Sequence, residues 1–67
     1  MLSQRDIVLL LRLATKGPMR PARTDVEPLW RLVRQGLARP VAGERSVYEI
    51  TAMGRDYLVA SSLVSWP

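Results

Sequence analysis

The start of the chain carries apolar residues at helical spacing. They follow the i, i+3, i+4, i+7 rule of an amphipathic helix at Ile7, Leu10, Leu11 and Ala14. Ser3 is a typical N-cap residue, and Gly17 followed by Pro18 is a typical stop signal. We therefore predict a helix over residues 3–16. Because further apolar residues widen the stripe, this helix is buried on most of its circumference or carries a dimer face.

A second helix is predicted over residues 25–35, where leucine and valine return at helical spacing. Its start has two alternatives. Thr24 as N-cap would form a capping box with the glutamate three residues later, whereas a later start would place Pro28 at the first helical position. Gly36 suits the left-handed position after a helix, and Leu37 can then contact the last helical turn as in a Schellman motif.

Beyond this glycine the spacing changes from helical to alternating. A hairpin is predicted over residues 37–51, with Tyr48 and Ile50 on one face of its second strand. Proline cannot donate to a strand ladder, so Pro40 indicates that the first strand lies at an edge.

Thr51 ends the hairpin and caps a last helix, predicted over residues 52–63. The inner side of this helix is expected at Met53, Tyr57 and Leu58, with Ser61 as a further candidate. Gly54 lies inside the predicted helix, where glycine costs about 1 kcal/mol. Either Gly54 allows a close approach to a neighbouring segment, or it is merely tolerated on the surface.

The order helix, helix, hairpin, helix predicts an α+β, mostly α fold with three helices and a two-stranded hairpin, in one domain over residues 1–67. Residues 29–39, a leucine-rich helix followed by Gly-Leu and a strand, resemble the recognition-helix-to-wing corner of MarR- and PadR-like winged-helix proteins. Residues 48–58 resemble the second wing strand and the helix after it. The resemblance implies a small winged helix. Two prolines in residues 18–23 leave room for at most one turn of the positioning helix.

The net charge of +4 suggests an anionic partner, and the resemblance implies double-stranded DNA, with the second helix in the major groove and the hairpin on phosphate or the minor groove. The expected DNA contacts are Arg20, Arg23, Arg31, Arg34, Arg39 and Arg45. Asp25 and Glu27 stand at the helix start and would repel phosphate, although Glu27 can pair with Arg31 one turn later. A solvated face with local ion pairs is the alternative.

The two tryptophans leave a second class of function open. Trp30 either covers the wing at the edge of the core or anchors a partner, and Trp66 is either a dimer contact or part of a loose tail. The first hypothesis is a DNA-binding transcriptional regulator, expected as a homodimer. The alternative is a protein–protein interaction module on a winged-helix scaffold. A viral or nucleoprotein assembly is one setting in which such a module would act. An architectural role on DNA is a weaker third hypothesis.

The composition argues against other classes. Histidine and cysteine are absent, so the usual nucleophiles, a neutral-pH general base and zinc ligands are missing. We expect no catalytic residues, no metal and no cofactor. No apolar run approaches the length of a membrane span or a signal core, so we expect no membrane partner and a cytoplasmic location.

Overall fold

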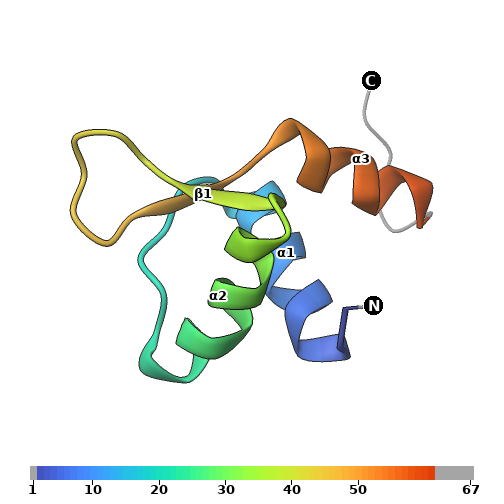
Figure 1. Ribbon diagram of the computed structural model, residues 1–67, viewed down its shortest axis with the longest axis horizontal. Helices are drawn as coiled ribbons and strands as arrows, with labels where there is room; N and C mark the ends of the chain where they lie inside the picture. The colour runs from blue at the N-terminus through green and yellow to red at the C-terminus, as the bar shows by residue number, and fades with distance from the viewer. Residues whose placement is uncertain (1, 62–67) are drawn as a thin grey trace.

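The structure is a computed structural model that describes residues 2–61. In chain order its elements are α1 (Gln4–Lys16), the 3₁₀ turn η1 (Arg23–Asp25), α2 (Val26–Arg34), β1 (Ala38–Pro40), β2 (Tyr48–Ile50) and α3 (Ala52–Ala60) (Figure 1). Within residues 2–61, three α-helices and one two-stranded antiparallel sheet confirm the predicted α+β, mostly α class. None of the helices in this range has both the length and the apolarity that crossing a bilayer requires.

Capping fixes both ends of α1 where the sequence predicts them. The Asp6 N–H donates to Ser3 Oγ over 3.2 Å, and the Ser3 N–H donates to Asp6 Oδ2 over 3.3 Å, which completes a reciprocal capping box. At the other end, Gly17 has a φ of +84° and its N–H donates to the Leu13 carbonyl over 3.1 Å. A left-handed residue of this kind costs least when it is glycine.

The start of α2 agrees with neither predicted alternative. The helix begins at Val26, directly after the single turn η1, and the Asp25 side chain makes no capping hydrogen bond. No capping box forms at Thr24. Pro28 falls in the first helical turn, where the missing N–H is one of those without a helical partner, so the proline is tolerated there.

The end of α2 is the predicted Schellman motif. Gly36 has a φ of +77° and its N–H donates to the Val33 carbonyl over 3.0 Å. The Leu37 N–H donates to the Leu32 carbonyl over 2.9 Å. Both leucines are buried in the core, so this motif turns the chain from α2 into the hairpin.

The strands of the hairpin are shorter than predicted, and a segment outside the hairpin pairs with the second strand. The strands pair in the register Ala38↔Ile50, Arg39↔Glu49 and Pro40↔Tyr48. Met19 and Tyr48 exchange two backbone hydrogen bonds of 3.0 Å each, so β2 lies between β1 and the loop after α1. β1 is therefore an edge strand, as Pro40 indicates. The bridge at Met19 is not predicted, because the flanking prolines obscure any strand pattern there.

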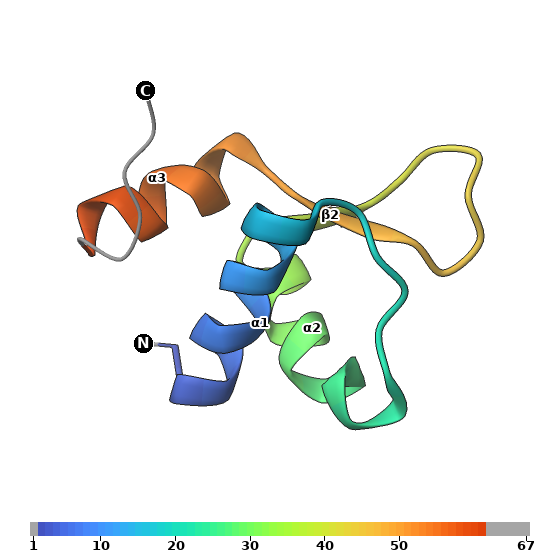
Figure 2. The same cartoon turned by 180° about the vertical axis from the view of Figure 1, so that it is seen from behind.

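One apolar core joins these elements. α1 lies behind α2 and β1 in Figure 1 and in front of them in Figure 2, and it contacts α2, β2 and α3. The buried apolar residues are Leu2, Leu9, Leu10, Leu13, Leu29, Leu32, Leu37, Ala38, Ile50 and Leu58. Burial of a leucine contributes roughly 1.5–3 kcal/mol. α1 is thus the element against which α2 and the hairpin are held.

The corner between β2 and α3 depends on one hydroxyl group. Thr51 Oγ1 accepts a hydrogen bond from the Gly54 N–H over 3.0 Å and donates to the Gly36 carbonyl over 2.6 Å. The N-cap of α3 is thereby tied to the glycine of the Schellman motif that follows α2. The helix ends at Ala60, three residues before its predicted end, and residues 62 and 63 lie outside the described range.

The inner side of α3 agrees with the prediction in part. Met53 is 57 % exposed, so its expected core position is wrong, and Ser61 is exposed as well. Leu58 is buried and Tyr57 is half-buried, which confirms the prediction for these two residues, and Gly54, one turn before Leu58, is buried as well. Of the two interpretations of Gly54, the close approach is correct, because a Cβ atom there would lie 2.7 Å from Ile50 Cγ1.

Candidate nucleic-acid interface

Arg31, one of the expected DNA contacts, is occupied by an ion pair. Its Nε lies 3.1 Å from Asp6 Oδ1 and 3.0 Å from Asp6 Oδ2, and its Nη2 lies 3.0 Å from Asp6 Oδ1. Glu27, the expected partner, adds only a weaker electrostatic attraction. Because Nε and Nη2 of the guanidinium group are directed at this carboxylate, Arg31 joins α2 to α1 and is not a free base-reading group.

Asp6 is the buried half of this pair. Its side chain is only 2 % exposed, whereas that of Arg31 is 43 % exposed. The hydrogen bonds from Arg31 hold the pKa of Asp6 below its ordinary value, although burial alone would raise it. The same hydrogen bonds raise the pKa of Arg31. Asp6 therefore carries its charge at neutral pH, with the capping bond from Ser3 as a further donor.

Two further contacts from α1 hold the segment that precedes α2. Arg5 Nη2 donates to the Thr24 carbonyl over 2.8 Å, and Arg12 Nη1 lies 3.7 Å from Asp25 Oδ2. The carboxylate of Asp25, expected to repel phosphate, is therefore faced by a cation. Together with the Asp6–Arg31 pair, these contacts hold α2 and the single turn η1 before it against α1.

Arg39 is also paired. Its Nε lies 2.7 Å from Glu49 Oε2, the directly opposite residue in the hairpin register. The Arg39 side chain is 65 % exposed, so this is a surface ion pair of about 0–1 kcal/mol. It reduces the positive charge that Arg39 presents to a phosphate.

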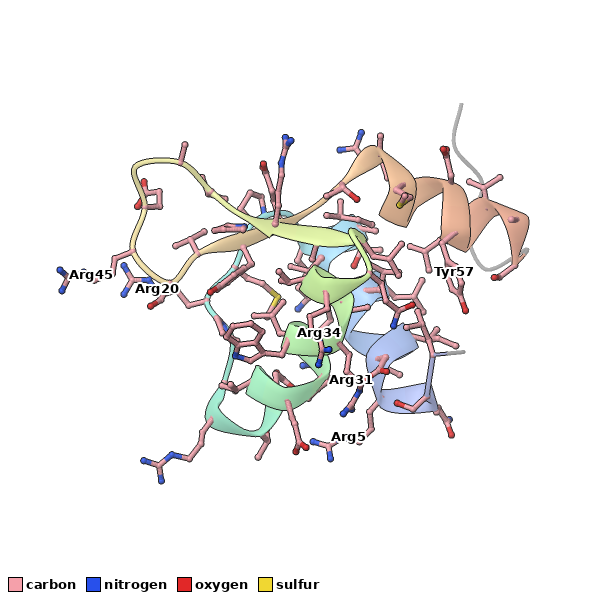
Figure 3. All side chains as sticks on the ribbon, in the orientation of Figure 1. Arg5, Arg20, Arg31, Arg34, Arg45 and Tyr57 are labelled. Carbon is pink, nitrogen blue, oxygen red and sulfur yellow. The ribbon has the colours of Figure 1, made fainter. Side chains whose placement is uncertain are left out.

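The other four expected arginines remain free to bind. Within residues 2–61, no hydrogen bond or ion pair occupies the exposed side chains of Arg20, Arg23, Arg34 and Arg45. Figure 3 shows Arg34 projecting from α2, and Arg20 and Arg45 extending at the far end of the hairpin. Pro21 and Ser46, which directly follow Arg20 and Arg45, line one groove.

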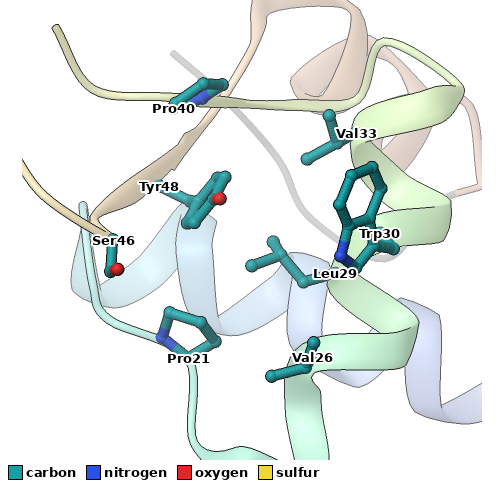
Figure 4. Close-up of a pocket in the computed structure, with 8 residues that line it drawn as sticks. All are labelled: Pro21, Val26, Leu29, Trp30, Val33, Pro40, Ser46 and Tyr48. Carbon is teal, nitrogen blue, oxygen red and sulfur yellow. The ribbon is translucent and has the colours of Figure 1, made fainter.

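That groove lies between α2, the hairpin and the loop after α1. It has a volume of about 360 Å³ and is lined by Pro21, Val26, Leu29, Trp30, Val33, Pro40, Ser46 and Tyr48 (Figure 4). Trp30 is 62 % exposed, so it lies outside the core and forms one wall of the groove. The sequence signal for this was the position of Trp30 off the inner stripe of α2. Trp66 lies outside the described residues.

The described residues offer no metal site, since no three His, Cys, Asp or Glu side chains within 2–61 lie close enough to hold an ion. Comparison with protein-family models, with curated proteins and with solved structures gave no match. The candidate interface combines an apolar groove with four guanidinium groups that make no ion pair within residues 2–61.

Proposed function

We propose that this chain is a winged-helix-type protein that binds double-stranded DNA through α2, the hairpin and the loop after α1. The observation that carries the proposal is a set of four arginines without acidic partners among the described residues, which come from α2, the hairpin and the segment between α1 and α2. Guanidinium groups pair with phosphate through two parallel donors. We further propose that the protein regulates transcription in the cytoplasm as a homodimer, which would place two such faces on adjacent half-sites.

The ion pairs support this arrangement in a second way. α2 can enter the major groove of DNA only if its angle to the rest of the domain is fixed. In helix-turn-helix proteins a positioning helix usually contributes to fixing that angle. Here η1 is a single turn. Contacts from Arg5, Arg12 and Asp6 of α1 hold α2 and the segment that precedes it in place. Arg31 thus serves orientation, while Arg34, one helical turn along, is left to contact the nucleic acid.

Salt dependence tests the proposal. Removing one arginine that binds a phosphate should reduce the slope of log affinity against log salt by about 0.9. On random-sequence duplex DNA, Arg34→Ala should therefore lower the slope by about 0.9, and the triple variant Arg20→Ala/Arg34→Ala/Arg45→Ala by about 2.7. Fluorescence anisotropy over a salt series measures both slopes.

Arg55→Ala is the matched control, because it removes one exposed positive charge from α3, outside the proposed interface. Its slope should stay at the wild-type value. An equal change in Arg55→Ala and Arg34→Ala would show that net charge alone determines binding. A wild-type chain that does not bind duplex at low salt would reject the proposal.

A protein-interaction module is the second candidate, favoured by one observation. A tryptophan that is 62 % exposed beside an apolar groove is typical of an interface anchor. This candidate predicts no salt-sensitive binding of duplex DNA, so the same titration separates the two.

A further inference from the structure

Two aromatic side chains from different elements face one another across the groove. Figure 4 shows Trp30 of α2 on one wall and Tyr48 of β2 on the opposite side, with Leu29 between them. Most of the lining is apolar, and Ser46 adds a hydroxyl group near one end. A volume of about 360 Å³ falls within the roughly 300–1,000 Å³ of small-ligand sites, which combine apolar walls with few polar groups. The shape and lining suit a flat, apolar-faced group.

The arginines beside the groove indicate which kind of flat group it binds. Arg20 directly precedes Pro21 and Arg45 directly precedes Ser46, and both following residues line the groove. Arg34 lies four positions after the lining residue Trp30 on α2, and residues at this spacing are neighbours on one side of a helix. Each of these guanidinium groups is without an acidic partner among residues 2–61. An apolar protein side chain does not require such a rim, whereas a nucleobase arrives attached to phosphates on both sides.

We propose that the groove binds one unpaired nucleobase, stacked on Trp30, while the rim arginines hold the flanking phosphates. The ligand class is single-stranded or locally opened nucleic acid. The inference rests on the proposed function, because the same arginines bind the backbone in both cases. It goes further in assigning a base-binding role to the groove. Stacking on an aromatic ring tolerates any base, since every base presents a π-face.

The test uses Trp66→Phe, which leaves Trp30 as the sole tryptophan. Two strands of about 12 nucleotides, within the usual site sizes for single-strand binding, are compared at low salt: oligothymidylate, and an abasic strand with the same sugar–phosphate backbone. We expect thymidylate to quench Trp30 fluorescence and to bind about tenfold more tightly, because stacking adds to the phosphate contacts. The abasic strand should bind without quenching.

Two variants, both in the Trp66→Phe background, separate stacking from folding. In Trp30→Ala, the two strands should bind with equal affinity by anisotropy of a labelled strand. Met53→Ala removes a comparably exposed apolar side chain from α3, outside the groove, and should keep the full preference for thymidylate. Circular dichroism confirms that each variant is folded.

The outcomes distinguish this inference from the proposed function. If both strands bind alike, and duplex DNA still binds, the groove does not take a base but the duplex proposal stands. If base-dependent quenching occurs without duplex binding, the inference stands and the duplex proposal is wrong. If neither strand nor duplex binds, both are overturned, and the apolar groove is left to a protein partner.

Discussion

Asp6→Asn is expected to lower the free energy of unfolding by about 3 kcal/mol, because it breaks a buried ion pair from its buried side. Asp6 accepts from Nε and Nη2 of Arg31 and from the N–H of Ser3. Asparagine retains the size but replaces one acceptor oxygen with a donor NH₂ group. A donor then faces other donors in a site that is 2 % exposed. Urea denaturation measures the difference.

Asp25→Asn is the matched control for this prediction. Asp25 also faces an arginine, but the distance is 3.7 Å and the Arg12 side chain is 52 % exposed. The expected loss is about 0–1 kcal/mol, as for other exposed pairs. Equal effects of the two substitutions would contradict the structural role of the Asp6–Arg31 pair.

The same ion pair makes stability depend on pH. The pKa of Asp6 is held below its ordinary value of 3.8 in the folded chain, so the contribution is complete above about pH 4. It is lost as the pH falls through the lowered folded pKa, because the unfolded chain then binds the proton more readily. The stability difference between wild type and Asp6→Asn should therefore shrink in acid.

Gly54→Ala is expected to destabilise the protein by about 2–3 kcal/mol, through overpacking. A Cβ atom at this position would collide with the Leu37 carbonyl oxygen and lie 2.7 Å from Ile50 Cγ1. The oxygen belongs to the backbone, and Thr51 already donates its N–H to it over 3.0 Å. The Leu37 carbonyl group therefore cannot move away without disturbing the corner between β2 and α3.

The sign of this effect is diagnostic. Inside a helix, alanine is normally favoured over glycine by about 1 kcal/mol, so an increase in melting temperature would contradict the close packing of Gly54. Gly43→Ala provides the comparison. A Cβ there meets nothing within 4 Å, and its φ of +80° leaves only backbone strain of about 1–2 kcal/mol. Thermal denaturation of the two variants measures both shifts.

Local signals in the sequence were sufficient for most of the fold. The pair Gly36 and Leu37 predicts a Schellman motif, because a positive φ and an apolar contact are needed at those two positions. Thr51 predicts the corner into α3, because one residue ends the strand and caps the helix. Such signals act over a few residues and can be read directly. The end of α3 was missed because no glycine or proline marks it.

The candidate site was less predictable, because its geometry depends on contacts between distant residues. Arg31 and Asp6 are 25 positions apart, so nothing in the pattern of α2 indicates that this arginine is already occupied. The exposure of Trp30 likewise depends on how far the hairpin stands from α2. Sequence reasoning therefore found the basic segment but could not separate structural arginines from free ones.

The proposed nucleic-acid interface comprises α2, the hairpin and the loop after α1, and its extent can be mapped residue by residue. The decisive experiment is an ¹⁵N–¹H chemical-shift titration of the full chain with random-sequence duplex DNA at low salt. We predict the largest shifts in residues 17–22, in α2 and in the hairpin from β1 to β2, with little change in α3. Largest shifts on α3 or on the outer face of α1, or no shifts at all, would contradict the proposed interface.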